Sequence, residues 1–264
     1  MSISIGTSGW AYREWQGGFY PPGLKPVAQL AHYVQHFNAV EINSTAYRTP
    51  SHETVHRWSA TMPVGFTAAV KLSHAITHAH RLRDADAMLA EFIASVRHFG
   101  DRRGPVLAQL PPGFAPDHVR LRDFLAAARS IMADPQWPLV IEFRHPEWIT
   151  ERTERLLDDA HASWCLGDMP MCPVTRPTAG AALLYLRRHG TDGRYRGSYD
   201  DQALQQDAEL LCAWATNGVP VYAFFNNTAD GAAVHNARRL QYLVAGRCGR
   251  LERATSEDLR RKIP

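Results

Sequence analysis

The chain has 264 residues, 45% of them hydrophobic, and its 29 basic and 26 acidic residues give a formal net charge of +3. This charge is too small to indicate a nucleic-acid partner by itself, and no apolar run is long enough to span a membrane. The N-terminus lacks the basic and apolar regions of a signal peptide. We therefore expect one domain over residues 1–264, located in the cytoplasm and without a membrane partner.

Eight short runs rich in β-branched or aromatic residues recur along the chain, and each has the length of a strand. They cover residues 2–7, 38–43, 66–72, 104–110, 138–143, 163–168, 181–189 and 219–227.

Amphipathic stretches lie between these runs and have the spacing of helices that pack on a sheet. The clearest cover residues 26–37, 117–132, 201–215 and 231–244. In the first, we expect one buried face made of Val27, Leu30, Ala31, Val34 and Phe37. Ser51 and Asp117 stand where N-caps belong.

Strands that alternate with helices predict βα units and a parallel sheet. Eight units in this length favour a single (β/α)8 TIM barrel, an α/β fold, over an open doubly wound sheet. No GxGxxG follows the first strand, which weakens the doubly wound alternative. After Asp168 the sequence is too rich in proline for a helix, so we expect the sixth helix to be missing.

Polar side chains stand at nearly every predicted strand end. Because side chains alternate between faces, Glu142 and Arg144 should share one face, while Ile141 and Phe143 face the helices. Catalytic groups of such barrels gather where the strands end. The polar residues at these ends are Glu41, Asn43, Lys71, Gln109, Glu142, Arg144, Asp168, Tyr185, Arg187, His189, Asn226 and Asn227.

Several motifs form one recognisable pattern, from Ile5 to about Leu243. They include IGTSGW, EINSTAY, QLPPGF, EFRHPEW, YLRRHG and FNNT. Together they resemble the YecE-like family, domain of unknown function family 72. The resemblance implies a TIM barrel and no established reaction. The family's likeness in shape to endonuclease IV and xylose isomerase barrels suggests nucleic acid only by analogy of fold.

Two loops have the composition of ligand-binding segments. The first, residues 8–24, is long and aromatic, and could be either a lid or an apolar plug. The second, residues 189–200, joins glycines to arginine and tyrosine, which suits an anion or a ring. His74, His78 and His80 have irregular spacing, so we expect surface or capping roles rather than a metal site.

The cysteines show neither a CxxC pair nor zinc-ribbon spacing, a pattern typical of free intracellular thiols. We expect four free thiols, at Cys165, Cys172, Cys212 and Cys248.

These patterns favour an acid–base enzyme that needs no metal or cofactor and acts on a small phosphate- or carboxylate-bearing molecule. Glu142 is the expected base or acid, and Lys71 could hold the anion, donate a proton or form a Schiff base. The candidate catalytic residues are Glu142, Lys71, Asp168, His189 and Glu41. The candidate substrate-binding residues are Asn43, Tyr47, Gln109, Arg144, Arg187, Tyr195, Tyr199, Asn226, Asn227 and Trp10.

Two alternatives stay open. One is a metal-dependent phosphodiesterase of the endonuclease IV type, although three cations at the same strand ends would repel a multinuclear zinc cluster. The other is a barrel without catalysis that binds a metabolite or, with weaker support, nucleic acid.

Overall fold

The computed structural model of the chain describes residues 3–133 and 137–261, with side chains up to Cys248. Its strands lie close to the eight predicted runs, except that the sixth run holds two short strands on either side of Cys165. The strands are β1 Ile3–Thr7, β2 Ala39–Ile42, β3 Thr67–Lys71, β4 Arg103–Gln109, β5 Leu139–Glu142, β6 Ser163–Trp164, β7 Leu166–Gly167, β8 Leu184–Arg188 and β9 Val221–Phe225.

Every pair of neighbouring strands is parallel, and the strands form two hydrogen-bonded sheets. One has the order β2-β3-β4-β5-β6 and the other β1-β9-β8-β7. The sheets adjoin where β6 leads into β7 and where Ser8, just after β1, bridges to Glu41 on β2. The strand order is therefore the cyclic order of a (β/α)8 barrel.

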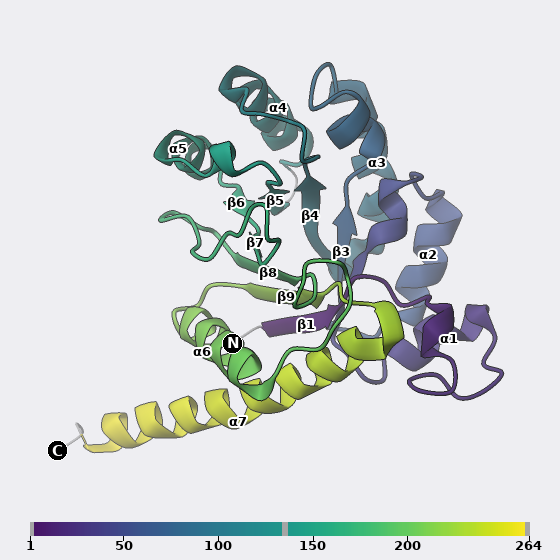
Figure 1. The fold of residues 1–264 in the computed structure, drawn as a ribbon, viewed down its shortest axis with the longest axis vertical. Coiled ribbons are helices and arrows are strands. Elements are labelled where there is room, and N and C mark those ends of the chain that lie inside the picture. Colours follow the sequence, from purple (N-terminus) through teal and green to yellow (C-terminus); the bar gives the residue numbers. More distant parts are fainter. Residues whose placement is uncertain (1–2, 134–136, 262–264) are drawn as a thin grey trace.

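Helices cover the outside of the strands (Figure 1). They are α1 Pro26–Tyr33, α2 His52–Thr61, α3 Asp86–Val96, α4 His118–Ile131, α5 Glu151–Asp159, α6 Asp201–Thr216 and α7 Ala232–Arg261. Residues 168–183, all of which the structure describes, contain no helix, as predicted from their prolines. No helix in the described ranges is long and apolar enough to cross a membrane.

The helix caps and faces follow the sequence in part. Ser51 and Asp117 cap α2 and α4 by accepting from backbone N–H groups, as predicted. The predicted face of α1 is only partly correct. Leu30 and Phe37 are buried and Val34 is half-buried, but Val27 is 81% exposed and Ala31 is also exposed. The helix also buries Gln29 and Tyr33, and the Tyr33 hydroxyl contacts the backbone of two strands.

The seam between β1 and β2 is closed by side chains rather than by a backbone ladder. The hydroxyl of Tyr33 accepts from the Thr7 N–H at 2.8 Å and donates to the Ala39 carbonyl at 3.0 Å. The side chain of Asn38, just before β2, bonds the backbone of β1 through Ile5 N and Ile3 O. A Cβ on Gly6 would lie 1.9 Å from the Ala39 carbonyl oxygen, so only glycine allows this approach.

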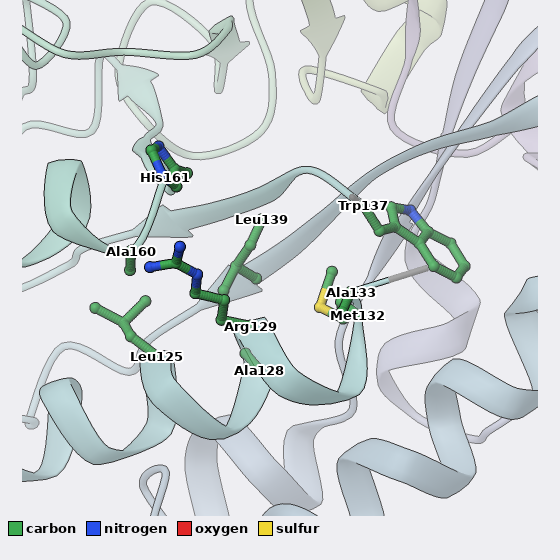
Figure 2. Close-up of a pocket in the computed structure, with 9 residues that line it drawn as sticks. All are labelled: Leu125, Ala128, Arg129, Met132, Ala133, Trp137, Leu139, Ala160 and His161. Atoms are coloured by element: carbon green, nitrogen blue, oxygen red, sulfur yellow. The ribbon is translucent and has the colours of Figure 1, made fainter. Parts of the chain in front are cut away.

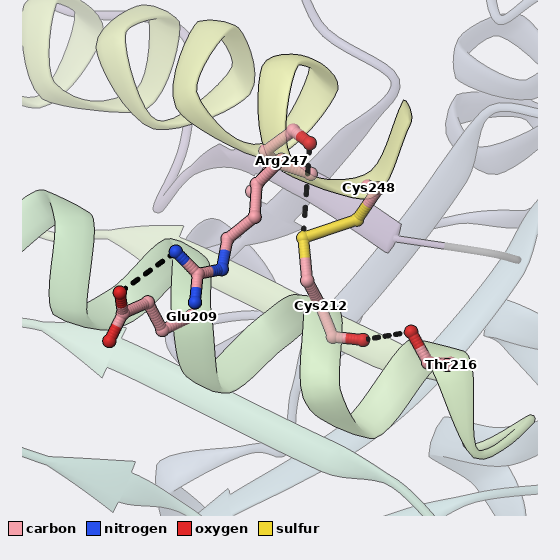
Figure 3. The surroundings of a disulfide bond; sticks show 6 residues. Glu209, Cys212, Thr216, Arg247 and Cys248 are labelled. Atoms are coloured by element: carbon pink, nitrogen blue, oxygen red, sulfur yellow. Dashed lines mark hydrogen bonds and ion pairs between the residues drawn. A yellow bond between two sulfur atoms is a disulfide. The ribbon is translucent and has the colours of Figure 1, made fainter. Parts of the chain in front are cut away.

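The expectation of four free thiols is wrong. Cys212 on α6 and Cys248 on α7, which are 36 positions apart in sequence, form a disulfide that links the two helices (Figure 3). The two helices pack side by side, which brings the sulfurs within bonding distance without any local spacing signature. Cys165 and Cys172 are free and buried.

Candidate functional site at the barrel mouth

A polar layer lies directly above an apolar layer inside the barrel. The apolar layer includes Ala39, Ala69, Leu107, Val140, Tyr185 and Phe224, one from each of six strands. The residues two positions later, on the same face of each strand, are Glu41, Lys71, Gln109, Glu142, Arg187 and Asn226. The C-terminal ends of the strands, here called the mouth, therefore carry polar groups that converge, as the period-2 alternation predicts.

Five of these side chains form a buried network that we call the mouth cluster. It consists of Glu41, Glu142, Arg144, Arg187 and His189, none of which is more than 4% exposed. Such burial is costly for charged groups unless they are paired and hydrogen-bonded.

Arg187 is the centre of the cluster because its guanidinium contacts both carboxylates. Its Nε and Nη2 bind Glu41 in a bidentate pair, at 2.9 Å and 2.7 Å. Its Nη1 binds Glu142 at 2.5 Å. Glu41 also accepts from the hydroxyls of Ser8, at 2.6 Å, and Tyr185, at 2.7 Å. This carboxylate is therefore fully engaged with donors.

Glu142 lies between two guanidinium groups. Arg144 Nη2 reaches its second oxygen at 2.6 Å, and His189 Nε2 lies 3.2 Å from the same oxygen. Burial by itself would raise the pKa of Glu142, but Arg144 and Arg187 outweigh it and hold the pKa well below its usual value. Glu41 follows the same pattern, since Arg187 overcomes the effect of burial and lowers its pKa. Both groups are stable carboxylates and weak bases.

His189 is held from both sides of its ring. Its Nε2 lies 3.0 Å from Arg187 Nη1 and 3.1 Å from Arg144 Nη2. The same Nε2 lies 3.2 Å from Glu142 Oε1, so it faces two donor groups and one acceptor. Nδ1 donates to Asp168, at 3.2 Å, because a carboxylate oxygen can only accept. Asp168 also accepts from the Tyr199 hydroxyl. The expected Asp168–His189 pair exists, and it is part of the same network.

Lys71 at the end of β3 differs from every other charged group of the mouth. Its ammonium has neither a hydrogen bond nor an ion pair within the described residues. Burial lowers its pKa to about 8, and the nearby charge of Arg187 acts in the same direction. Glu142 and Glu41 oppose this shift without cancelling it. At pH 7 about a tenth of the amine is therefore neutral, far more than for a lysine of ordinary pKa.

Two histidines after Lys71 border the same side of the mouth. The rings of His74 and His78 lie 4.1 Å apart. Burial lowers the pKa of both, that of His78 to about 4, and the charge of Lys71 adds to the effect. Tyr47, which is 78% exposed, places its ring 4.9 Å from that of His74. These two histidines are neutral rim residues, while His80 is exposed.

Several polar atoms at the mouth are buried without a hydrogen-bond partner in the described part of the chain. They are Asn43 Oδ1, Arg144 Nε, His74 Nε2, His145 Nδ1 and Asn227 Oδ1. Buried polar atoms nearly always have hydrogen-bond partners. Several unpartnered ones at the ends of neighbouring strands are therefore typical of a ligand site. Gln109 is satisfied, since its Nε2 donates to the Leu110 carbonyl.

The other predicted binding residues lie outside this network or serve the backbone. Trp10 packs edge-to-face on Trp58 of α2, so its ring is committed to packing. The amide of Asn227 ties the loop after β8 to α7 through Gly197 and Asn236. We therefore assign Trp10 and Asn227 to packing and loop anchoring.

The two loops with ligand-like composition have different fates. In the first, Trp15 and Tyr20 are each 1% exposed, so this loop packs as a plug. In the second, Tyr195 is 44% exposed, with its ring 6.0 Å from His189. Asn226 is half-buried, and its backbone N–H bonds Arg188 O. Tyr195 and Asn226 stay on the rim.

Sequence reasoning missed two elements of the site. Ser8 was not expected at the mouth, although alternation places it on the opposite face from Ile5, which packs in the core outside the inner layer. Arg188 faces outward and forms a pair with Asp207 on α6, and it also lies 3.6 Å from Asp168. No pattern in the sequence indicates that second pair.

The donor geometry bears on metal binding. Within the described residues, no three His, Cys, Asp or Glu side chains are placed to share a metal ion.

A separate cavity of about 370 Å³ lies between α4 and α5, at the opposite end of the barrel (Figure 2). It is lined mainly by apolar side chains such as Leu125 and Leu139, with Arg129 and His161 on its wall.

Comparison with known proteins shows the family to which the chain belongs and structures that resemble it. A family profile, described as protein of unknown function DUF72, matches residues 4–259. The UPF0759 protein YecE of Escherichia coli (strain K12) is 29% identical over 153 residues, which cover 58% of this chain and 52%, about half, of that relative. A DUF72 family crystal structure from Thermotoga maritima superposes with a TM-score of 0.82 and 26% identity, covering 93% of this chain and all of that chain.

A more distant likeness concerns the fold alone. A xylose isomerase-like TIM barrel fused to 4-hydroxyphenylpyruvate dioxygenase superposes with a TM-score of 0.53 and 13% identity, over 97% of this chain and 45% of that one. This agrees with the barrel order of the strands.

Proposed function

We propose that this chain, which belongs to the DUF72 family of proteins of unknown function, is an enzyme that moves a proton on a small anionic substrate at the barrel mouth. The observation that carries the proposal is the state of Lys71. The Lys71 ammonium has no hydrogen-bond or ion-pair partner among the described residues, whereas the arginines and glutamates beside it at the mouth are paired with one another. Its pKa of about 8 lies near the operating range of a general acid or base.

Lys71 takes the place of Glu142, the expected base or acid, as the group that transfers the proton. Glu142 is engaged with two guanidinium groups and has a strongly lowered pKa, so it would accept a proton poorly. Glu41 is engaged in the same way. The two carboxylates hold the guanidinium groups of Arg144 and Arg187 in place. Positive groups in fixed positions stabilise negative charge that develops on a substrate during the reaction.

The anionic character of the substrate rests on the donors that remain. Arg144 Nε is buried without a partner in the described part, although its Nη2 is engaged with Glu142. Together with the Lys71 ammonium, it offers two positive donors to a carboxylate or phosphate. The rim histidines His74 and His78 are neutral at pH 7, so they can offer hydrogen bonds to the substrate but no charge.

Solvent exchange tests the proposal across a whole class of substrates at once. The protein is incubated in D₂O with small carboxylates and phosphates that bear a C–H next to a carbonyl, and deuterium incorporation is followed by NMR. Lys71→Met is compared with Lys25→Met, the same change at an exposed position. Exchange should fall by about 10²-fold or more in Lys71→Met and stay unchanged in Lys25→Met.

A binding arm uses inorganic phosphate and thermal unfolding. Phosphate should raise the melting temperature of the wild type and of Lys25→Met, and should do so less in Lys71→Met. If no compound exchanges and phosphate acts alike on all three proteins, the proposal is wrong.

The metal-dependent phosphodiesterase has less support from the geometry. Its carboxylate ligands would have to leave the guanidinium groups that now hold them. Metal analysis of the untagged protein checks this alternative, and one metal ion per chain that is required for activity would favour it.

A further inference from the structure

We infer that Lys71 is a nucleophile, and that the substrate of the mouth is an anionic aldehyde or ketone whose carbonyl carbon forms an imine with the Lys71 amine. The inference rests on the proposed function and goes further, because it names the functional group on which the site acts.

Position 71 holds a lysine in a chain whose basic residues are mostly arginines. Of the 29 lysine and arginine residues, only three are lysines: Lys25, Lys71 and Lys262. The two other cations of the inner mouth, Arg144 and Arg187, follow the general preference of this chain for arginine. An arginine can hold an anion but stays protonated, whereas a lysine can lose its proton and attack carbon. A lysine is therefore the residue type that carbonyl chemistry requires here.

The charged groups around Lys71 favour the neutral form of its amine. Arg187 and Arg144 face it from β8 and from the end of β5, and both disfavour its ammonium form. Glu142 and Glu41 face it from β5 and β2, but they are engaged with those guanidinium groups. On its own side lie His74 and His78, which are neutral at pH 7. Burial and a neighbouring cation are the two conditions that activate a lysine for imine formation.

The backbone from which the Lys71 side chain extends is held in place by its neighbours. The Lys71 carbonyl accepts from the Thr45 hydroxyl at 2.7 Å, which ties the end of β3 to the segment after β2. Lys71 pairs with Leu107 on β4, and the next inner residue of that strand is Gln109. The lysine stem therefore rises from a rigid strand end, while its amine has no competing partner in the described chain.

The chemistry balances without any further reagent. The neutral amine adds to the carbonyl carbon, and the carbonyl oxygen takes up a proton to give a carbinolamine. The carbinolamine then loses its hydroxyl group as water, which leaves the C=N bond. The two protons of that water are the two that the amine has lost. Because the imine nitrogen is readily protonated, it draws electrons from the adjacent carbon and makes its C–H bond acidic. This is the proton transfer that the proposed function requires.

Reductive trapping on the wild-type protein tests the inference. Sodium cyanoborohydride reduces an imine to a stable amine, and peptide mapping by mass spectrometry locates the adduct. The probes are pyruvate, which bears a carboxylate, dihydroxyacetone phosphate, which bears a phosphate, and acetone, which bears neither. Lys25, which is exposed, is the control within the same molecule.

At pH 7 at least one anionic probe should label Lys71 more than about tenfold faster than Lys25, because a larger fraction of the Lys71 amine is neutral. Acetone should label Lys71 more slowly than that probe. The better of the two anionic probes identifies the charged group that the site prefers. Inorganic phosphate should slow labelling of Lys71 and leave labelling of Lys25 unchanged.

Labelling of Lys71 that does not exceed that of Lys25 with either anionic probe would overturn the inference. Equal labelling by acetone would overturn the anionic part of it. These failures can be told apart from failure of the proposed function, because deuterium exchange that depends on Lys71 would persist without trapping if the lysine acts only as an acid or base.

Discussion

Arg187, at the end of β8, binds the carboxylate of Glu41, at the end of β2, through a bidentate pair that joins residues 146 positions apart in sequence. The same guanidinium binds Glu142 on β5. One side chain thus connects three strands from both sheets at the mouth. The charges of these strands are satisfied by one another, which leaves Lys71 as the group that a ligand would meet.

Loss of Arg187 should destabilise the protein strongly. The substitution Arg187→Met would leave the buried Glu41 without its guanidinium partner and Glu142 with Arg144 alone. Such uncompensated charge costs about 3–5 kcal/mol. Urea unfolding followed by circular dichroism measures this loss. Arg122→Met, which removes an exposed pair with Asp123, is the matched control and should change the midpoint little. Equal effects of the two substitutions would contradict a structural role for the cluster.

Glu142→Gln should also act mainly on folding, and its effect should depend on pH. The lowered pKa of Glu142 means that its stabilising contribution is fully present above the ordinary value of about 4.5 and disappears as the pH falls further. At pH 7 the variant should lose about 3 kcal/mol or more of unfolding free energy. The difference from the wild type should shrink below about pH 4. A variant as stable as the wild type at pH 7 would instead suit a purely catalytic carboxylate.

The β1–β2 seam should depend on one hydroxyl. Tyr33→Phe leaves the Thr7 N–H and the Ala39 carbonyl without their shared partner, which should cost about 1–3 kcal/mol. Tyr222→Phe is the control, because the Tyr222 hydroxyl has no hydrogen bond within the described residues and its ring is also partly buried. Similar losses in the two variants, measured by thermal unfolding, would show that the seam does not rely on Tyr33.

Counting thiols tests the link between α6 and α7. The denatured protein should expose two reactive thiols without reductant and four after reduction, because only Cys165 and Cys172 are free. Cys248→Ser should lower the unfolding free energy by about 2–4 kcal/mol under oxidising conditions and have little effect under reducing ones. Four thiols without reductant would mean that these sulfurs are not bonded.

Much of the architecture and of the mouth follows from local patterns in the sequence. The alternation of side chains along each strand is enough to place Glu41, Glu142 and Arg187 on one inner face. The prolines after Asp168 are enough to remove a helix.

Other features depend on contacts between segments far apart in sequence. Tyr33 is buried with its hydroxyl at the β1–β2 seam, so the apolar periodicity of α1 indicates only part of the buried face. The disulfide depends on the register of α6 against α7. In the same way, residue types alone indicate three cations at the mouth, but only the geometry separates the two engaged arginines from Lys71.

Direct titration of the Lys71 amine tests the central claim. With three lysines in the chain, the NMR spectrum of protein carrying ¹³C-lysine holds three Cε signals, and the signal missing in Lys71→Met belongs to Lys71. We predict that this signal titrates near pH 8, and that phosphate moves its midpoint upward by stabilising the ammonium form. Titration at the ordinary lysine value of about 10.5, unaffected by phosphate, would contradict the account.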